Sequence, residues 1–275
     1  MTLGWVQILV LAAIQGLSGV LPLSDAGFLA LGRKILGLPL DGSADRFYHA
    51  LLQITIALVI FVVFRKDLAA CAGLRTKRAR RRAEAYPNED GLNHRMFLLI
   101  LIALLPMTLA FFLRNWAQGL MTRLPAIGGI FLLYGFILFL CDRVGHGKRG
   151  LPEATIGDSL ILGFAQTFSA VPGLSGMGLA FTAGILRGLS PAFCIRFSCL
   201  LLIPVYLVRG IVGLFGALDG AGFSLAYLGG ILVCGVCCYL GLWLLRFMAK
   251  RGTLGEFTYF AWGAGLFTFC LYLFS

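Results

Sequence analysis

The chain has 275 residues, of which 59% are hydrophobic and 13% are charged, whereas charged residues make up roughly 25% of an average soluble domain. This composition indicates an integral membrane protein and excludes a soluble globular domain. A formal net charge of +11 could suggest nucleic-acid binding, but the basic residues cluster between apolar stretches, where they determine membrane topology. We therefore expect no nucleic-acid partner.

The first apolar stretch, approximately residues 4–36, is interrupted in its middle. Residues 15–27 read QGLSGVLPLSDAG, in which Pro22 is closely followed by Ser24 and Gly27. Proline removes a backbone donor and glycine permits unusual dihedral angles, so one helix should end here and another begin. The sequence predicts a broken helix.

The next apolar stretch, residues 48–64, predicts a membrane span and is followed by one long polar segment, residues 65–95. Six basic residues gather in that segment: Arg75, Lys77, Arg78, Arg80, Arg81 and Arg82. They can be interpreted as a topology signal that places the segment in the cytoplasm or as a patch for anionic lipids. Two further spans are predicted over residues 96–113 and 125–141.

The second half of the chain repeats the interrupted pattern. A broken helix is predicted over residues 156–187, where Pro172 and Gly173 are followed by Ser175. At an offset of 151 residues, the two interruptions share the pattern Q-x2-S-x-V-x2-L-S-x2-G without a gap. Three further spans are predicted, over residues 193–214, 225–246 and 256–274.

These stretches predict an all-α polytopic membrane protein with six transmembrane helices and two re-entrant helix hairpins. With the N-terminus outside, fifteen of the 23 Lys and Arg residues fall in cytoplasmic segments and five in outer segments, as the positive-inside rule requires. The hairpins then enter from opposite sides. We expect a single membrane domain of two inverted repeats, about residues 1–150 and 151–275, as in secondary transporters.

The interruptions are the predicted binding site. A half-helix that starts at Ser24 or Ser175 points free N–H groups and a positive dipole end at the break, and phosphate suits such an end. Either serine could instead be a plain helix cap. Because Gln15 and Gln166 also stand at equivalent places, we expect a ligand site that includes these four residues and Gly176.

Two charged residues stand out because they lie inside apolar segments. Asp25 is the sole embedded carboxylate, and Arg209 is the one deep cation. An acidic residue in a membrane suggests a function, although Asp25 could also cap a helix at a wet hairpin tip. Arg209 could pair with Asp25 or with a phosphate, or extend to the membrane interface.

The eight cysteines lie mostly within apolar segments, which is typical of small packing residues and not of a disulfide framework. Cys234, Cys237 and Cys238 form a cluster, but it lacks the second pair of ligands that a zinc site requires. No metal and no cofactor are expected.

The order of these motifs resembles the undecaprenyl-diphosphate phosphatase family, membrane enzymes also known for bacitracin resistance. The matching pieces extend over nearly the whole chain: Leu21-Pro22-Leu23-Ser24, Phe47 with Gln53, Gln166, Pro172-Gly173-Leu174-Ser175, and Arg196-Phe197-Ser198 running to Ile203-Pro204. The resemblance implies six spans, two re-entrant helix pairs in inverted repeats, and a polyprenyl-phosphate site between the hairpins. It also implies a place in the bacterial cytoplasmic membrane.

Several polar residues of the family pattern are replaced in this chain. Gly19, Phe28 and Gly176 stand where the family has a glutamate, a histidine and the arginine that would clamp a diphosphate. Diphosphate hydrolysis needs charge neutralisation and a positioned proton acceptor, and Asp25 is the only candidate for a catalytic base. We therefore expect little or no hydrolysis.

The expected function is binding or translocation of a polyprenyl phosphate during recycling of the envelope lipid carrier. Two half-helix ends supply roughly one positive charge, which favours a monophosphate over a diphosphate. The alternatives are an active phosphatase with an altered site, in which Arg209 or Arg196 takes the clamp's role, and a pseudoenzyme that transports nothing. The sequence leaves the oligomeric state open, a homo-oligomer included.

Overall fold

The structure, a computed structural model, describes residues 3–40, 45–71, 88–144, 147–217, 224–251 and 254–274. Most of these residues are helical. The described residues contain one isolated β-bridge, a parallel one between Arg149 and Leu189, and no β-strand. The helices are α1 (Trp5–Ser18), α2 (Asp25–Ile35), α3 (Arg46–Val63), α4 (Arg65–Cys71), α6 (Asn88–Met107), α7 (Leu109–Met121), α8 (Leu124–Arg143), α9 (Ile156–Thr167), η1 (Phe168–Ala170), α10 (Gly176–Leu186), α11 (Pro191–Phe215), α12 (Ala226–Arg251) and α13 (Glu256–Leu273).

Within the described residues, four helices are long and apolar enough to cross a membrane, namely α3, α8, α11 and α12. Each exposes large apolar side chains, for example Leu58, Phe136, Val208 and Trp243, which a soluble protein would cover. Shorter apolar helices accompany them: α1, α10 and residues 94–107 of α6. The chain is therefore an all-α polytopic membrane protein, as its composition predicted.

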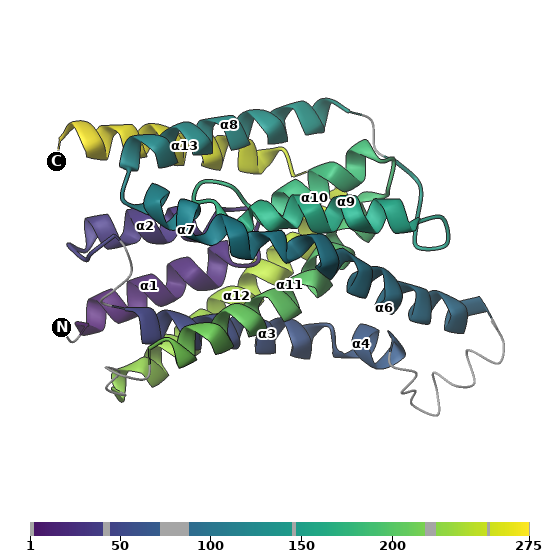
Figure 1. Ribbon diagram of the computed structural model, residues 1–275, viewed down its shortest axis with the longest axis horizontal. Coiled ribbons are helices and arrows are strands. Elements are labelled where there is room, and N and C mark those ends of the chain that lie inside the picture. Colours follow the sequence, from purple (N-terminus) through teal and green to yellow (C-terminus); the bar gives the residue numbers. More distant parts are fainter. Residues whose placement is uncertain are drawn as a thin grey trace.

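Both predicted helix interruptions are present. α1 ends at Ser18 and α2 starts at Asp25, while α9 ends at Thr167 and α10 starts at Gly176. α1 packs against α2 and α9 packs against α10, so each interruption joins two contacting helices. In Figure 1, α1 and α2 extend toward the side of the N-terminus, and α9 and α10 extend toward the opposite side.

Helices from the two halves of the chain pack in reciprocal pairs. α1 packs on α12, and α9 packs on α6; α12 also contacts α3, and α6 also contacts α11. Two further pairs with extensive contact join α3 to α11 and α8 to α13, and Figure 1 shows the second pair along one edge of the molecule. These contacts bring α11 of the second half against α3 of the first.

The single span predicted over residues 96–113 was wrong, because the chain forms two helices there. α6 ends at Met107 and α7 starts at Leu109. Pro106, in the last turn of α6, cannot donate to the helical ladder and crowds the preceding turn, which favours a break near this point. The Pro106 carbonyl instead accepts a hydrogen bond from the Thr167 hydroxyl at 3.1 Å, so this break lies beside the end of α9.

The polar segment predicted over residues 65–95 contains helical structure at both ends. α4 occupies its start, and α6 begins at Asn88. Asp67 of α4 pairs with Arg196 of α11 at 2.5 Å, so Arg196 is engaged at the end of the molecule away from the interruptions. The six basic residues between positions 75 and 82 lie outside the described residues, and their role stays a prediction.

A buried ion pair fixes the start of α3 to the end of α2. Arg33 and Asp45 make contacts of 3.1–3.2 Å through two guanidinium nitrogens, and their side chains are 4% and 3% exposed. A bidentate pair of this kind fixes orientation as well as distance. The cysteines whose side chains the structure describes, in contrast, are free thiols: Cys141, Cys194, Cys199, Cys234, Cys237, Cys238 and Cys270.

Candidate functional site

The first break, residues 19–24, turns the chain between α1 and α2. Ser24 caps α2, since its Oγ accepts a hydrogen bond from the Gly27 N–H at 3.2 Å, a typical role for serine before a helix. Asp25 follows at the first helical position, and its Oδ1 accepts a hydrogen bond from the Ala26 N–H at 2.8 Å. The positive end of the α2 dipole stabilises a carboxylate at this position.

The second break, residues 168–175, is built in a similar way but carries no charge. Gly173 has a φ of +100°, which residues with a Cβ atom rarely adopt. Ser175 caps α10, because its Oγ accepts a hydrogen bond from the Gly178 N–H at 3.3 Å. Gly176 occupies the position equivalent to Asp25, so α10 starts without a carboxylate.

The two breaks contact each other. Ser24 Oγ accepts a second hydrogen bond from the Gly173 N–H at 2.8 Å, and Tyr134 of α8 donates to the Pro22 carbonyl at 2.9 Å. A Cβ atom at Gly27 would lie 2.8 Å from the Gly173 nitrogen, so the close approach requires glycine here. The tips of the two predicted hairpins therefore meet inside the molecule.

A pocket lies between the two breaks and the middle of α11. The pocket is small and partly open to the outside, with an enclosed volume of about 10 Å³. Leucine, valine and methionine side chains form one part of the wall, which suits a ligand with both a polar and an apolar portion. The polar side chains of the lining are Ser18, Asp25, Gln166, Ser169, Ser175, Tyr206 and Arg209.

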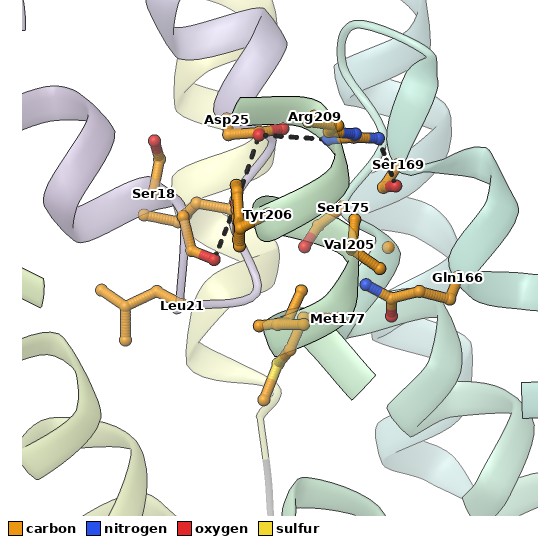
Figure 2. A pocket seen from close by; sticks show the side chains of 14 residues that line it. Ser18, Leu21, Asp25, Gln166, Ser169, Ser175, Met177, Val205, Tyr206 and Arg209 are labelled. Atoms are coloured by element: carbon orange, nitrogen blue, oxygen red, sulfur yellow. Dashed lines mark hydrogen bonds and ion pairs between the residues drawn. The ribbon is translucent and has the colours of Figure 1, made fainter. Parts of the chain in front are cut away.

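Arg209 connects the two breaks across this pocket. Figure 2 shows its guanidinium between Asp25 of α2 and Ser169 of the second break. Nη1 lies 3.6 Å from Asp25 Oδ2, and Nη2 donates to Ser169 Oγ at 2.8 Å. The Tyr206 hydroxyl lies 3.2 Å from the same Asp25 oxygen and 2.9 Å from the Gly19 carbonyl oxygen. One cation and one carboxylate thus share the pocket.

Gln166 presents an unused amide to the same pocket (Figure 2). Its exposed fraction is 0%, and within the described part of the chain neither Nε2 nor Oε1 has a hydrogen-bond partner. A buried polar group without a partner costs about 1–3 kcal/mol. A Cβ atom at Gly176 would lie 3.0 Å from Gln166 Nε2, so this amide lies beside the first residue of α10.

The structure brings most of the predicted site residues together. Those that line the pocket are Asp25, Gln166, Ser175, Gly176 and Arg209. Gln15 and Ser24 do not line it. Ser24 uses its Oγ to hold backbone N–H groups, and Gln15 is fully buried with no partner among the described residues.

Ser18, Ser169 and Tyr206 are polar site residues that sequence reasoning missed. Ser18 and Ser169 are equivalent positions of the pattern shared by the two breaks, so their place in the repeat was a usable signal. Tyr206 precedes Arg209 by three positions, which puts both on one face of α11. Arg209 itself pairs with Asp25, one of the three roles considered for it.

Comparison with known proteins identifies the family to which this fold and pocket belong. The family model described as "Bacitracin resistance protein BacA" matches residues 8–267. The chain belongs to the BacA family. This membership confirms the resemblance found in the sequence motifs.

Among curated proteins similar to this BacA-family chain, two come from Corynebacterium jeikeium (strain K411). "Undecaprenyl-diphosphatase 1" is 29% identical over 96% of this chain and 90% of its own length. "Undecaprenyl-diphosphatase 2" is 28% identical over 94% of this chain and 91% of its own length. "Undecaprenyl-diphosphatase 3" of Bacillus cereus is 25% identical over 96% of both chains.

Proposed function

We propose that this BacA-family protein binds the phosphate headgroup of undecaprenyl phosphate or a related polyprenyl phosphate in the pocket between the two breaks. The observation that carries the proposal is the convergence of Arg209, the unpartnered Gln166 and the start of α10 on one pocket. Arginine offers an ionic partner, and the helix end offers N–H groups and partial positive charge. The names of the relatives, undecaprenyl-diphosphatases, support a phosphorylated polyprenyl lipid as the ligand class.

We further propose that the protein carries this lipid between the two leaflets of the bacterial cytoplasmic membrane. The reciprocal helix pairs and the opposed broken helices support an architecture of two inverted repeats, about residues 1–150 and 151–275, with two re-entrant hairpins and six crossings, one of them made by α6 and α7 together instead of by a single helix. Such an architecture can expose one central site to each side in turn. A site between the two breaks would lie at the centre of that movement.

Hydrolysis of a diphosphate is expected to be weak or absent. The reaction needs several positive groups around the phosphoryl group and a free proton acceptor. Among the described residues that line the pocket, Arg209 is the one basic residue. Ala26, Tyr206 and Arg209 engage both oxygens of the Asp25 carboxylate, which is poorly suited to a base that must collect a proton.

The second candidate function is a phosphatase with an altered site. The juxtaposition of Asp25 and Arg209 at 3.6 Å favours it, because Asp25 would act as the base and Arg209 as the clamp. Arg196 is a weaker candidate for the clamp, since it pairs with Asp67 and does not line the pocket.

One preparation of purified protein in lipid vesicles can separate the two functions. Exchange of undecaprenyl phosphate between leaflets and release of phosphate from undecaprenyl diphosphate should be measured in parallel. We expect exchange above that of protein-free vesicles and no appreciable phosphate release. Robust release that disappears in Asp25→Asn would establish the phosphatase instead, and the lack of both exchange and binding would contradict the proposal.

A further inference from the structure

The starts of α2 and α10 are equivalent positions of the repeated pattern, but only α2 carries a charge there. Asp25 and Gly176 are separated by the 151-residue offset of the repeat. Asp25 Oδ1 accepts the Ala26 N–H at 2.8 Å, and Oδ2 lies 3.2 Å from the Tyr206 hydroxyl and 3.6 Å from Arg209 Nη1. The carboxylate therefore occupies the place where a helix start would bind an anion.

The start of α10 offers the same place to an external anion. α10 has 11 residues with no acidic residue in its first turn. Beside it, the fully buried amide of Gln166 lines the pocket without a partner among the described residues. Arg209 Nη2 reaches this side as well, since it donates to Ser169 at 2.8 Å.

The two anion positions lie close together because one guanidinium serves both. Nη1 of Arg209 faces the Asp25 carboxylate, and Nη2 faces Ser169 beside the α10 start. A single phosphate bound at the α10 start can share Arg209 with Asp25. A second phosphate linked to the first would extend toward the carboxylate, where like charges repel strongly in surroundings of low dielectric constant.

We propose that Asp25 determines specificity by limiting the site to one phosphate, so that a polyprenyl monophosphate binds and a polyprenyl diphosphate is rejected. The inference rests on the proposed function, because it concerns the same lipid site. Asp25 then acts as the protein's own anion at the first break. It need not take part in any chemical step.

The test compares affinities for undecaprenyl phosphate and undecaprenyl diphosphate in detergent micelles, with wild type and Asp25→Asn. Asparagine keeps the shape of the side chain and is also suited to a helix start. Wild type should bind the monophosphate more tightly, and Asp25→Asn should shift the ratio of the two affinities toward the diphosphate by about tenfold or more. Asp25→Ser serves as a second uncharged variant, and thermal unfolding shows whether each variant is folded.

Gly176 provides a matched experiment at the equivalent position. Gly176→Asp should place a second carboxylate at the α10 start and weaken binding of the monophosphate by more than Gly176→Ala does. The alanine variant is needed because a Cβ atom at Gly176 would lie 2.5 Å from Ser169 Cβ, so part of the effect will be steric. Equal losses in folded Gly176→Asp and Gly176→Ala would contradict an anion position at this helix start.

The outcomes separate this inference from the function on which it rests. If wild type binds the monophosphate but the affinity ratio is unchanged in both folded Asp25 variants, the role of Asp25 is refuted and the lipid-phosphate site stands. If wild type binds neither lipid, both proposals are refuted. If wild type already prefers the diphosphate, the proposed limit to one phosphate is refuted, whereas the lipid-phosphate site itself stands.

Discussion

The hydroxyl oxygen of Ser24 accepts hydrogen bonds from two backbone N–H groups, that of Gly27 at 3.2 Å and that of Gly173 at 2.8 Å. The first bond caps α2, and the second reaches into the other half of the chain. One serine thus couples the start of a helix to the position of the opposite break. This coupling explains why Ser24 has an exposed fraction of 0% and does not line the pocket.

Replacing Ser24 with alanine should destabilise the protein by about 2–4 kcal/mol. The loss combines a missing helix cap, worth about 1 kcal/mol, with a buried Gly173 N–H left without its partner, which costs about 1–3 kcal/mol. Thermal unfolding in detergent measures the change. Ser190→Ala is the control, because among the described residues the Ser190 hydroxyl caps α11 through the Phe193 N–H and makes no link to the other half. A loss no greater than that of the control would show that the link between the breaks contributes little.

Replacing Gln166 with leucine should weaken binding of undecaprenyl phosphate by about tenfold, because a hydrogen bond to the charged headgroup is lost. The stability of the unliganded protein should stay the same or rise, since a buried amide without a partner is replaced by an apolar group of similar size. Gln15→Leu is the matched control. Gln15 is equally buried and unpartnered among the described residues but lies outside the pocket, so its replacement should leave the affinity nearly unchanged. Equal losses of affinity in the two variants would contradict the assigned site.

Replacing Arg209 with glutamine should weaken binding of the lipid phosphate by about 10- to 100-fold, the effect of losing a hydrogen bond to a charged group. Arg209→Lys should recover part of the affinity, because it keeps the charge and loses the forked geometry. Equilibrium binding to detergent-solubilised protein measures both effects. Arg196→Gln is the control, since Arg196 pairs with Asp67 away from the pocket, and a comparable loss there would argue against a specific role for Arg209.

Replacing Asp45 with asparagine should destabilise the protein by about 3–5 kcal/mol, because Arg33 would keep its charge in a buried place without a carboxylate. The Arg33 and Asp45 side chains are 4% and 3% exposed. Asp67→Asn breaks a more exposed pair, because the side chains of Arg196 and Asp67 are 42% and 32% exposed. The free energy of unfolding should therefore fall by less than about 1 kcal/mol. Unfolding midpoints of the two variants, measured side by side, check the difference.

Local signals in the sequence predicted the helix interruptions and the caps correctly. Proline, glycine and serine act on the backbone within a few residues, so Pro22 and Ser24 were sufficient to place the start of α2. The division of residues 96–113 into two helices depended on the same kind of signal, Pro106, which the strong apolar character of the surrounding stretch obscured.

Contacts between the two halves could not be predicted in the same way. The repeat made Gln15 and Gln166 equivalent, and it did the same for Ser24 and Ser175. In the structure, however, only Gln166 and Ser175 of these residues line the pocket. Which copy faces the pocket depends on how the two halves pack, and a repeated pattern carries no information about that difference.

The hydroxyl of Tyr206 has one proton and two acceptors within reach, the Gly19 carbonyl at 2.9 Å and the Asp25 carboxylate at 3.2 Å. When a phosphate shares Arg209 with Asp25 and the carboxylate shifts slightly, the tyrosine can give its proton wholly to the Gly19 carbonyl. No buried donor is then stranded, and leaving one unpaired would cost about 1–3 kcal/mol. The shared proton thus lets the carboxylate adjust to an occupant of the pocket without leaving the buried Tyr206 hydroxyl unpaired.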